Sequence, residues 1–536
     1  MTSSSEAVGR SDVTSGSEPS FSYEPLTPTT YLRRASHVFR DRPAVLDGDR
    51  SFTYAQFWSR AARLAGGLAA RGVEPGDRVA VLAPNSAALV EAHNGVPLAG
   101  AVLVPMNTRQ KASELGYILS HSGARTLIHD TALGETARGA AEQADHDVTL
   151  IEVGGDDDTY EDLLDGADQL ALDVDELDLL AINYTSGTTG RPKGVMYSHR
   201  GAYLQALAMA FHAQLQADSV YLWTLPMFHC CGWCFTWGVS AAGGLHLCLR
   251  AIDAGEIWRL VREHGVTHMS AAPTVLNMIA NSDAAEEGPA PREVHVDTGG
   301  APPSPTLLAR LAELNMQVTH LYGLTESYGP VMINQWQPEW SDLDADEQAN
   351  LRARQGVANV VGERPRVLTD DDGDAPADGE TEGEIALRGN NVMLGYYRDT
   401  EQTRELTASG WFRTGDVGVM HPNGYVELSD RKKDVIISGG ENIASVEVEQ
   451  AIETHEAVLE AAVVAKPDEQ WGEIPVAFVT LRDGAELDAD AVIAHVKDRI
   501  ANYKAPREVH FAALPKTSTG KIEKHVLRDE VEAADG

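Results

Sequence analysis

Lysine is scarce in this chain of 536 residues. From Met1 to Arg431 only Lys111 and Lys193 occur, and 80 acidic side chains stand against 43 basic ones, for a formal charge of −37. So acidic a surface repels nucleic acid and anionic membranes, and we expect neither as a partner. The combination of few lysines with many acidic residues predicts a halophilic cytoplasm. There, the high salt concentration shortens the Debye length and so screens the repulsion between the acidic side chains. An acidic mesophilic protein is the alternative.

Long apolar runs and a secretory signal are also absent. No stretch approaches the roughly 18 uninterrupted apolar residues of a membrane-spanning helix, so no integral membrane span is expected. Residues 1–22 are rich in Ser, Thr and Gly without a basic start or an apolar core, and we interpret them as a disordered tail. The four cysteines fall between Cys230 and Cys248, too close together to staple a large chain. A reducing cytoplasm is therefore the expected compartment.

The length predicts more than one domain, because single cores stop growing near roughly 250 to 300 residues. Arg78 to Asn107 and Val294 to Ser327 each read as strand, polar loop, helix and strand. Such units predict parallel crossovers of an α/β fold, with ligands at the carboxyl ends of the strands. Pro338 to Glu382 is acidic and contains Pro and Gly, and we interpret much of it as a solvated connection.

Beyond Gly424 the composition changes. Strand-like residues lead through a double-glycine loop into a helix at about Ser445, followed by two strands, a helix and a basic end. This is enough for a small domain of about 100 residues. Eight lysines gather in this part of the chain, among them Lys432, Lys433, Lys504, Lys516, Lys521 and Lys524.

The segment YTSGTTGRPKGV, from Tyr184 to Val195, follows the apolar run LDLLAINY and therefore leaves the end of a strand. Its glycines allow backbone amides to face an anion, its hydroxyls add donors, and Lys193 adds a compact positive charge. The pattern predicts a phosphate-binding loop, although Pro192 breaks the strict Walker sequence. A flexible linker is the alternative, but a linker would not be expected directly after a buried strand or to retain a scarce lysine.

Two further loops leave predicted strands: GGAPP (Gly299 to Pro303) and YGLTES (Tyr322 to Ser327). Together they offer a flat glycine surface for a base, a threonine for phosphate, and Glu326 for Mg²⁺, which prefers one or two carboxylates plus phosphate oxygens. Asp416 follows a turn, where a carboxylate accepts both hydroxyls of a ribose; an Asx turn is the alternative. The run from Arg431 to Lys433 is either a junction between domains or a solvated charge run.

The chain resembles the adenylate-forming superfamily of acyl-CoA synthetases, adenylation domains and luciferases. The resemblance is carried by five motifs in this order: the phosphate loop, YGLTE, TGD, DRKKD and TGK. The resemblance runs from about Tyr23 to Arg528. It implies an α/β fold, with a large multi-layer N-terminal domain of mostly parallel sheets (23–430), a hinge (431–433) and a small mobile α+β C-terminal domain (434–536). PMFHCCGW and GGENIASVEVE are most similar to the branch for short, medium or aromatic acids, which includes methylmercaptopropionate-CoA ligases.

The resemblance also implies roles for individual residues. ATP or AMP would be bound by Thr185, Ser186, Gly187, Thr188, Thr189, Gly190, Lys193, Gly300, Ala301, Pro302, Tyr322, Gly323, Thr325, Asp416, Arg431, Lys433 and Lys521. Mg²⁺ would be held by Thr185 and Glu326. The acyl pocket would include His229, Trp233, Gly300 and Val331, and Gly439, Gly440 and Glu441 would face CoA. The catalytic residues would be Lys521, Thr325, Glu326 and Lys193.

The expected function is an ATP-dependent ligase that joins a short- or medium-chain fatty acid to coenzyme A, through an acyl-adenylate and with release of pyrophosphate and AMP. Its partners would be the acid, ATP and CoA, with a homodimer as one assembly. Three alternatives are an enzyme that loads a separate carrier protein, a ligase for an aromatic or methylthio acid, and a regulator that binds nucleotide without catalysis. A redox function for Cys231 and Cys234 is disfavoured by the apolar residues around them.

The negative charge makes a first prediction. Self-repulsion should destabilise the folded state when screening is weak. We expect the melting temperature to rise by several degrees from low salt to molar KCl, measured by differential scanning fluorimetry. A melting temperature that does not change with salt would contradict the halophilic interpretation and leave the enzymatic one intact.

Overall fold

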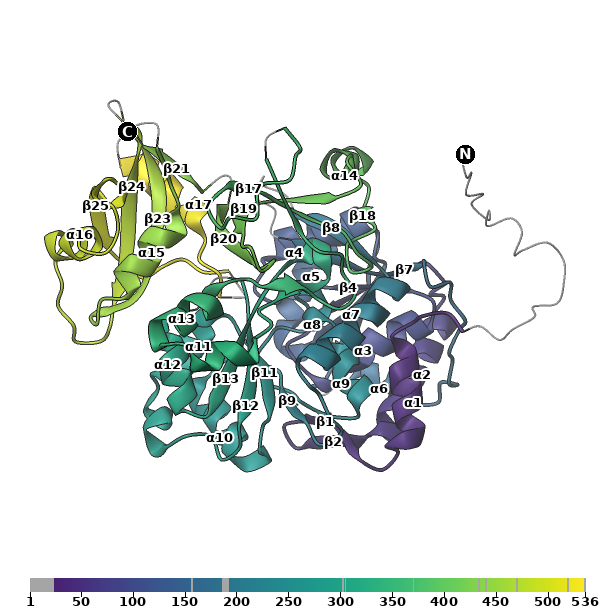
Figure 1. The fold of residues 1–536 in the computed structure, drawn as a ribbon. Helices are drawn as coiled ribbons and strands as arrows, with labels where there is room; N and C mark the ends of the chain where they lie inside the picture. Colours follow the sequence, from purple (N-terminus) through teal and green to yellow (C-terminus); the bar gives the residue numbers. More distant parts are fainter. Residues whose placement is uncertain are drawn as a thin grey trace, which may run out of the picture.

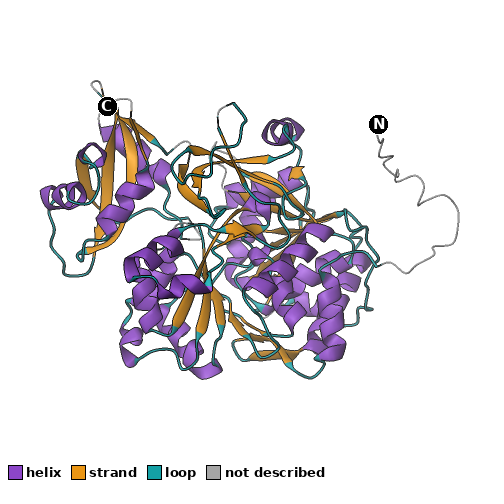
Figure 2. Cartoon of the chain, in the orientation of Figure 1, coloured by secondary structure: helices purple, strands orange, loops and turns teal. Residues whose placement is uncertain are grey.

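The computed structural model describes residues 24–155, 158–185, 192–300, 303, 305–369, 371–431, 434–438, 441–468, 471–517 and 520–534. The expected N-terminal tail lies outside this part of the chain. Figure 1 shows a large body of sheets and helices with the C-terminal residues, in yellow-green, as a smaller unit beside it. In Figure 2, helices lie along both sides of the sheets. No described helix is long and apolar enough to cross a membrane.

Two large sheets form the body. The first has nine described strands in the order β15-β14-β13-β12-β11-β9-β10-β1-β2, and the second has seven, β18-β8-β7-β4-β3-β5-β6. Their central neighbours pair in parallel, and their edge strands pair antiparallel except β6, which pairs parallel with β5. The strands of the first sheet are β1 Pro43–Asp47, β2 Arg50–Thr53, β9 Val220–Leu222, β10 Leu245–Leu247, β11 His268–Ser270, β12 Val294–Thr298, β13 Met316–Leu324, β14 Gly329–Ile333 and β15 Val357–Ala358. Those of the second are β3 Arg78–Leu82, β4 Val102–Pro105, β5 Thr126–Asp130, β6 Thr149–Val153, β7 Leu179–Thr185, β8 Lys193–Ser198 and β18 Gly395–Tyr396.

Both predicted crossover units are present. β3 leads through α3 (Ala87–Leu98) to the parallel β4, and β12 leads through α12 (Pro305–Glu313) to the parallel β13. Every residue of α3 is buried, which explains its lack of a polar face. The remaining helices of the body are α1 Thr29–Val38, α2 Tyr54–Ala70, α4 Ala112–Ser122, α5 Gly134–Gln143, α6 Thr159–Leu164, α7 His199–His212, α8 Cys230–Trp233, α9 Phe235–Ala242, α10 Ala254–His264, α11 Pro273–Ala280, α13 Ala345–Ala353 and α14 Thr400–Thr407.

The interpretation of 338–382 as a solvated connection is only partly right. The segment contains α13, β15 and the strand β16 (Arg366–Leu368), which joins β17 (Glu382–Leu387), β19 (Phe412–Met420) and β20 (Val426–Arg431) in an antiparallel sheet. The side chain of Asp344 accepts the Glu347 amide and caps α13, while Leu368 is buried in the sheet. The acidic composition hid these short elements because each buries only a few side chains.

The C-terminal unit is built on another sheet. β21 (Ile436–Ser438), β22 (Glu441–Ile443), β23 (Val458–Asp468), β24 (Gly472–Leu481) and β25 (Glu508–Phe511) form it, with α15 (Ser445–Glu453) and α16 (Ala489–Lys497) packed alongside. The predicted helix at Ser445 is confirmed. Sequence reasoning missed β25 and the final helix α17 (Lys524–Ala534), whose Leu527 and Val531 pack against Val464. The predicted fold class is confirmed, whereas the domain boundaries and the hinge stay predictions.

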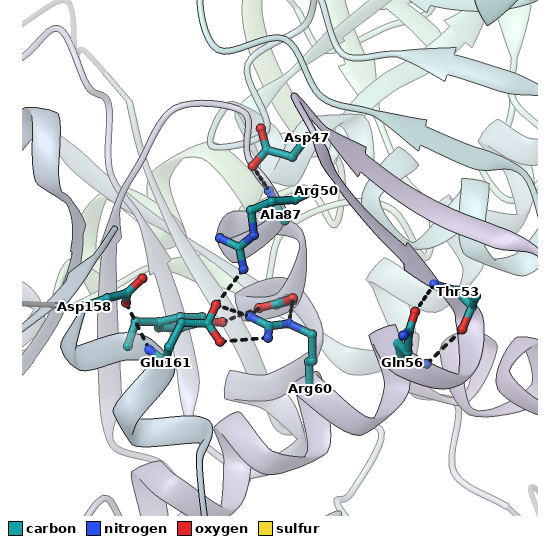
Figure 3. A network of polar contacts seen from close by, with 10 residues as sticks. Asp47, Arg50, Thr53, Gln56, Arg60, Ala87, Asp158 and Glu161 are labelled. Carbon is teal, nitrogen blue, oxygen red and sulfur yellow. Dashed lines mark hydrogen bonds and ion pairs between the residues drawn. The ribbon is translucent and has the colours of Figure 1, made fainter. Parts of the chain in front are cut away.

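A buried network of charges ties α2, α3 and α6 together (Figure 3). The guanidinium of Arg60 donates to Glu161 at 2.7 and 2.8 Å and to Glu91 at 2.5 Å. Glu91 is 1% exposed and also accepts a hydrogen bond from Tyr160 at 2.8 Å. Arg50 reaches Glu161 at 2.6 Å. The network satisfies a carboxylate that would otherwise be buried without a partner.

This network predicts a large effect of one substitution. Arg60→Leu leaves Glu91 buried and unpaired, which should destabilise the fold by about 3 to 5 kcal/mol and lower the melting temperature clearly. The double variant Arg60→Leu/Glu91→Leu should recover much of the loss, because it removes both charges. Arg259→Leu is the matched control, since Arg259 pairs with Glu256 on exposed α10. Equal melting temperatures for Arg60→Leu and Arg259→Leu would contradict this account.

Candidate active site

The predicted phosphate loop lies between β7 and β8. These strands pair antiparallel, and Lys193 stands directly opposite Thr185 in their register. The two ends of the loop are therefore adjacent, with the lysine at the mouth of the turn. The intervening predicted ligands, Ser186, Gly187, Thr188, Thr189 and Gly190, lie outside the described residues.

Lys193 and Glu326 meet at one tyrosine. The hydroxyl of Tyr396 donates to Glu326 Oε1 at 2.7 Å, and Lys193 Nζ lies 5.5 Å from the centre of the Tyr396 ring. Burial and the neighbouring Glu326 carboxylate raise the pKa of Tyr396, so it stays a hydrogen-bond donor. The fold thus brings a predicted phosphate ligand and a predicted magnesium ligand, 133 positions apart in the sequence, to the two sides of one ring.

Thr325 is held by the neighbouring strand β8 and by the acyl-pocket segment. Its carbonyl accepts the Tyr197 hydroxyl at 2.6 Å, and its own hydroxyl lies 3.6 Å from Cys230 Sγ. Tyr197 stacks on Tyr328 with ring centres 3.8 Å apart, and Tyr328 in turn contacts the backbone of Ser198. These contacts fix the YGLTES loop beside the predicted acyl pocket.

The predicted base and ribose ligands converge in a second place. The Tyr322 hydroxyl donates to Asp416 Oδ2 at 2.6 Å, and Asp416 is 4% exposed. In the register of β19 and β20, the backbone of Asp416 stands opposite that of Arg431. Gly323 needs to be glycine, because a Cβ there would lie 1.9 Å from the carbonyl oxygen of Gly329. Gly300 is exposed at the end of β12, whereas the predicted neighbours Ala301 and Pro302 lie outside the described residues.

The predicted acyl pocket contains an unusual turn. Five consecutive residues from Cys230 to Cys234 have φ between 45° and 62°, although only Gly232 is a glycine. Left-handed backbone costs non-glycine residues about 1 to 2 kcal/mol each, so contacts must hold it. The side chain of Asn183, near the end of β7, accepts the Cys231 amide at 3.0 Å. Burial raises the pKa values of the thiols in this turn, which disfavours the redox alternative.

The turn directs Trp233 between two strand ends. A Cβ on Gly299 would lie 3.3 Å from the indole, and one on Gly329 would lie 2.8 Å from it. Val331, also predicted for the pocket, is buried two residues beyond Gly329 in β14. The indole therefore fills the space between β12 and β14 that the glycines leave open.

The C-terminal unit docks on α11. Thr274 Oγ1 donates to the carbonyl of Gly520 at 3.1 Å, Asn277 donates to the carbonyl of Leu459 at 3.2 Å, and Arg482 donates to Asn281 at 3.0 Å. The approach is close at Gly520, where a Cβ would lie 2.5 Å from Thr274 Oγ1 and where φ is +85°. These contacts place the loop that precedes Lys521 directly against the body.

Lys521 approaches the acyl pocket in this arrangement. Burial and the positive charge of Lys521 lower the pKa of His229 to about 4, so the imidazole is neutral at physiological pH. Two other lysines brace the Lys521 loop within the C-terminal unit. Lys516 Nζ pairs with Glu460 at 2.7 Å, and Lys524 Nζ pairs with Glu449 at 2.7 Å.

A cleft of about 860 Å³ separates the body from the C-terminal unit beside this loop. The body contributes Arg109 and Arg250 to its lining, and the C-terminal unit contributes Arg482 and Lys516. Glu460 and Asp483 line it as well, and Lys516 pairs with Glu460, so the cationic side chains exceed the acidic ones by two. This excess of positive charge suits a ligand that carries phosphate groups.

Several predicted residues are not described or were not found. Lys433, Gly439 and Gly440 lie outside the described residues, and of Glu441 only the strand position in β22 is known.

The sequence analysis did not identify Tyr396 and Tyr197, which hydrogen-bond to Glu326 and Thr325. Each is an aromatic residue in a strand, and aromatic residues are common in any sheet, so the sequence alone does not single them out.

The residues present fit a magnesium ion, because the Glu326 carboxylate lies near Lys193 at the end of the predicted phosphate-binding loop. In the part of the chain that the structure describes, no group of three or more His, Cys, Asp or Glu side chains could hold a metal. A site that uses one carboxylate and the oxygens of bound phosphates matches the preference of Mg²⁺.

Residues 32–397 match the AMP-binding enzyme family and residues 447–521 match the C-terminal domain of AMP-binding enzymes. The peroxisomal acetate/butyrate–CoA ligase of Arabidopsis thaliana is 44% identical over 94% of each chain. The 2-methylpropanoate–CoA ligase of Humulus lupulus is 42% identical over 95% of each chain. ATP-bound MatB from Rhodopseudomonas palustris has a TM-score of 0.83 at 27% identity, over 95% of this chain and 100% of that chain. The chain therefore belongs to the AMP-binding enzyme family, as its motifs predict.

Proposed function

We propose that this protein is an ATP-dependent carboxylic acid:CoA ligase that acts on short-chain acids. The observation that carries the proposal is the hydrogen bond from Thr274 to Gly520, which brings the Lys521 loop of the C-terminal unit against the body, on the side of His229 and the predicted acyl pocket. Relatives of full length that are named acetate/butyrate–CoA and 2-methylpropanoate–CoA ligases support the same reaction and the same size of acid. The sequence-based prediction of an acyl-CoA synthetase agrees with these relatives.

In the first step, the acid's carboxylate attacks the α-phosphorus of ATP, and pyrophosphate leaves with the bonding electrons. No protein nucleophile is required, so catalysis rests on orientation and on cations placed where negative charge develops. Lys521 would bridge the acid and the α-phosphate, with Thr325 on the α-phosphate and Lys193 on the leaving group. His229, kept neutral by burial and by Lys521, adds no competing positive charge to the pocket wall.

Mg²⁺ would be held by Glu326 and Thr185 together with phosphate oxygens, and when bound it would neutralise charge on the departing pyrophosphate. The hydroxyl of Tyr396 donates a hydrogen bond to Glu326 Oε1 and so orients this carboxylate. In the second step, the thiol sulfur of CoA attacks the acyl carbon, AMP leaves, and the thiol proton is lost to solvent. The cationic cleft beside Lys516 suits the phosphates of CoA.

We further propose a halophilic, reducing cytoplasm as the setting. The formal charge of −37 supports the first part, and four free, buried cysteines support the second. Lipid metabolism is the process in which a short-chain acyl-CoA would be used.

The proposal is tested by AMP formation from ATP and a series of acids in molar KCl, with and without CoA. We expect AMP to accumulate over many turnovers only when acid, Mg²⁺ and CoA are all present, with acyl-CoA formed in equal amount. Pyrophosphate release without turnover on free CoA would favour the carrier-loading alternative. No release with any acid would favour the regulator.

Lys521→Ala should separate the two half-reactions. Loss of a preorganised cation in the first step should slow pyrophosphate release about 100-fold or more, by analogy with the loss of one oxyanion donor. Conversion of supplied acyl-adenylate and CoA to thioester should stay near the native rate. Both steps are measured in single-turnover assays, with Lys497→Ala on α16 as the control lysine.

Equal slowing of both steps by Lys521→Ala would mean that the lysine is structural. The opposite pattern is expected from Lys433→Pro, because proline fixes the φ angle at the proposed hinge. That variant should release pyrophosphate normally and form thioester slowly.

Trp233→Ala should shift the preference of the enzyme toward longer acids, because it empties the space between Gly299 and Gly329. We expect kcat/KM for octanoate relative to butyrate to rise about tenfold or more, as one methylene in an apolar pocket is worth about 1 to 3 kcal/mol. Trp411→Ala is the control, since Trp411 stacks under Arg366 outside the pocket. A native enzyme that prefers long chains would contradict the assigned role of the indole.

A further inference from the structure

One carboxyl group in the middle of the large sheet has no hydrogen-bond or ion-pair partner among the described residues. Asp297 lies in β12 and is 9% exposed, and among the described residues no side chain or amide donates to its carboxylate or forms an ion pair with it. Burial alone raises its pKa to about 7. A nearly buried carboxyl group without a hydrogen bond costs folding free energy, so its presence at this position needs an explanation.

The strand register shows which way Asp297 faces. Val294 and Val296 alternate with it and pack in the cluster formed with α10, α11 and α12. Asp297 therefore points to the opposite face of β12, which it shares with Gly299, two residues or about 7 Å further along the strand. Trp233 packs against Gly299 on that face. The carboxyl group thus lies one pleat deeper than the indole, along the wall of the acyl pocket.

Two hydroxyls stand next to Asp297 on the same face. Ser270 is directly opposite Asp297 in the pairing of β11 and β12, and the Tyr221 hydroxyl lies 2.8 Å from Ser270 Oγ. Tyr221 and Ser270 are buried, and Tyr221 packs against Phe235, which follows the acyl-pocket turn. The strand wall predicted for the acyl pocket therefore continues, beyond Gly299, into a carboxyl group with a pair of hydrogen-bonded hydroxyls beside it.

We propose that Asp297, supported by Tyr221 and Ser270, binds the far end of the acyl chain and selects short acids that carry a terminal hydroxyl group. This inference rests on the proposed ligase function and names its substrate class. A substrate hydroxyl would supply the missing partner of the buried carboxyl group. A site built in this way disfavours the unsubstituted acid, which would leave Asp297 unpaired in the closed pocket.

A hydroxyl fits better than an ammonium group. With a pKa near 7, Asp297 is partly protonated at neutral pH, and a hydroxyl pairs with both forms because it donates and accepts. An ammonium group only donates, and its transfer from water into this pocket would require full ionisation of Asp297.

The test compares matched pairs of acids: propionate with 3-hydroxypropionate, butyrate with 4-hydroxybutyrate, and pentanoate with 5-hydroxypentanoate, with 4-aminobutyrate as a further arm. We expect the native enzyme to have a higher kcat/KM for the hydroxy acid in at least one pair. Asp297→Leu should lower that ratio by about 10- to 100-fold, mainly by slowing the hydroxy acid. Asp297→Asn, which keeps the size and one donor, should lower it less, and Tyr221→Phe should act in the same direction.

Glu453→Gln is the matched control, because Glu453 is a half-buried carboxyl group with a raised pKa that lies in α15 of the C-terminal unit. It should leave the ratio unchanged. If all variants fold and activate butyrate, but the native enzyme prefers the unsubstituted acid and the ratio is insensitive to Asp297, the inference is overturned while the ligase function stands. A preference for 4-aminobutyrate over 4-hydroxybutyrate overturns it as well. Failure to activate any acid overturns the ligase function and, with it, this inference.

Discussion

The close approach of Gly520 to Thr274 determines where the Lys521 loop lies relative to the body of the protein. The carbonyl oxygen of Gly520 and the hydroxyl of Thr274 are 3.1 Å apart, which leaves no room for a side chain at position 520. The next residue is Lys521. Because the lysine belongs to a unit with its own sheet and core, its position depends on this contact and on the neighbouring hydrogen bonds from α11. The chemistry of the pocket is thus coupled to the packing of two units that each hold together separately.

Much of this arrangement is readable from the sequence. Arg78 to Asn107 predicts β3, α3 and β4 because apolar runs, a polar loop and a buried helix follow one another at crossover spacing. Lys193 is identifiable because the first 431 residues of this acidic chain contain only one other lysine, Lys111, so its retention needs a reason. The same logic applies to the loop before Lys521, where glycine and hydroxyls again surround a cation.

Other features depend on contacts that no local pattern reports. Tyr396 orients Glu326 from 70 positions away, and only the pairing of β18 with β8 brings it there. α13 lies in a segment whose acidic composition suggests a linker, since a short helix needs few apolar residues. Asp297 reads as an ordinary loop-edge aspartate until the register of β11, β12 and β13 fixes the face on which it lies.

The left-handed turn from Cys230 to Cys234 has a consequence for how the pocket can evolve. Each position of the turn is tied to a backbone angle that β-branched and bulky residues adopt poorly, so few substitutions there keep the fold. Apart from Gly299, Gly323 and Gly329, where a Cβ would be crowded, the opposite wall is formed by extended strands and accepts a wider range of side chains at unchanged backbone. Changes of substrate among descendants of this sequence should therefore accumulate on the strand wall, while the turn stays nearly fixed.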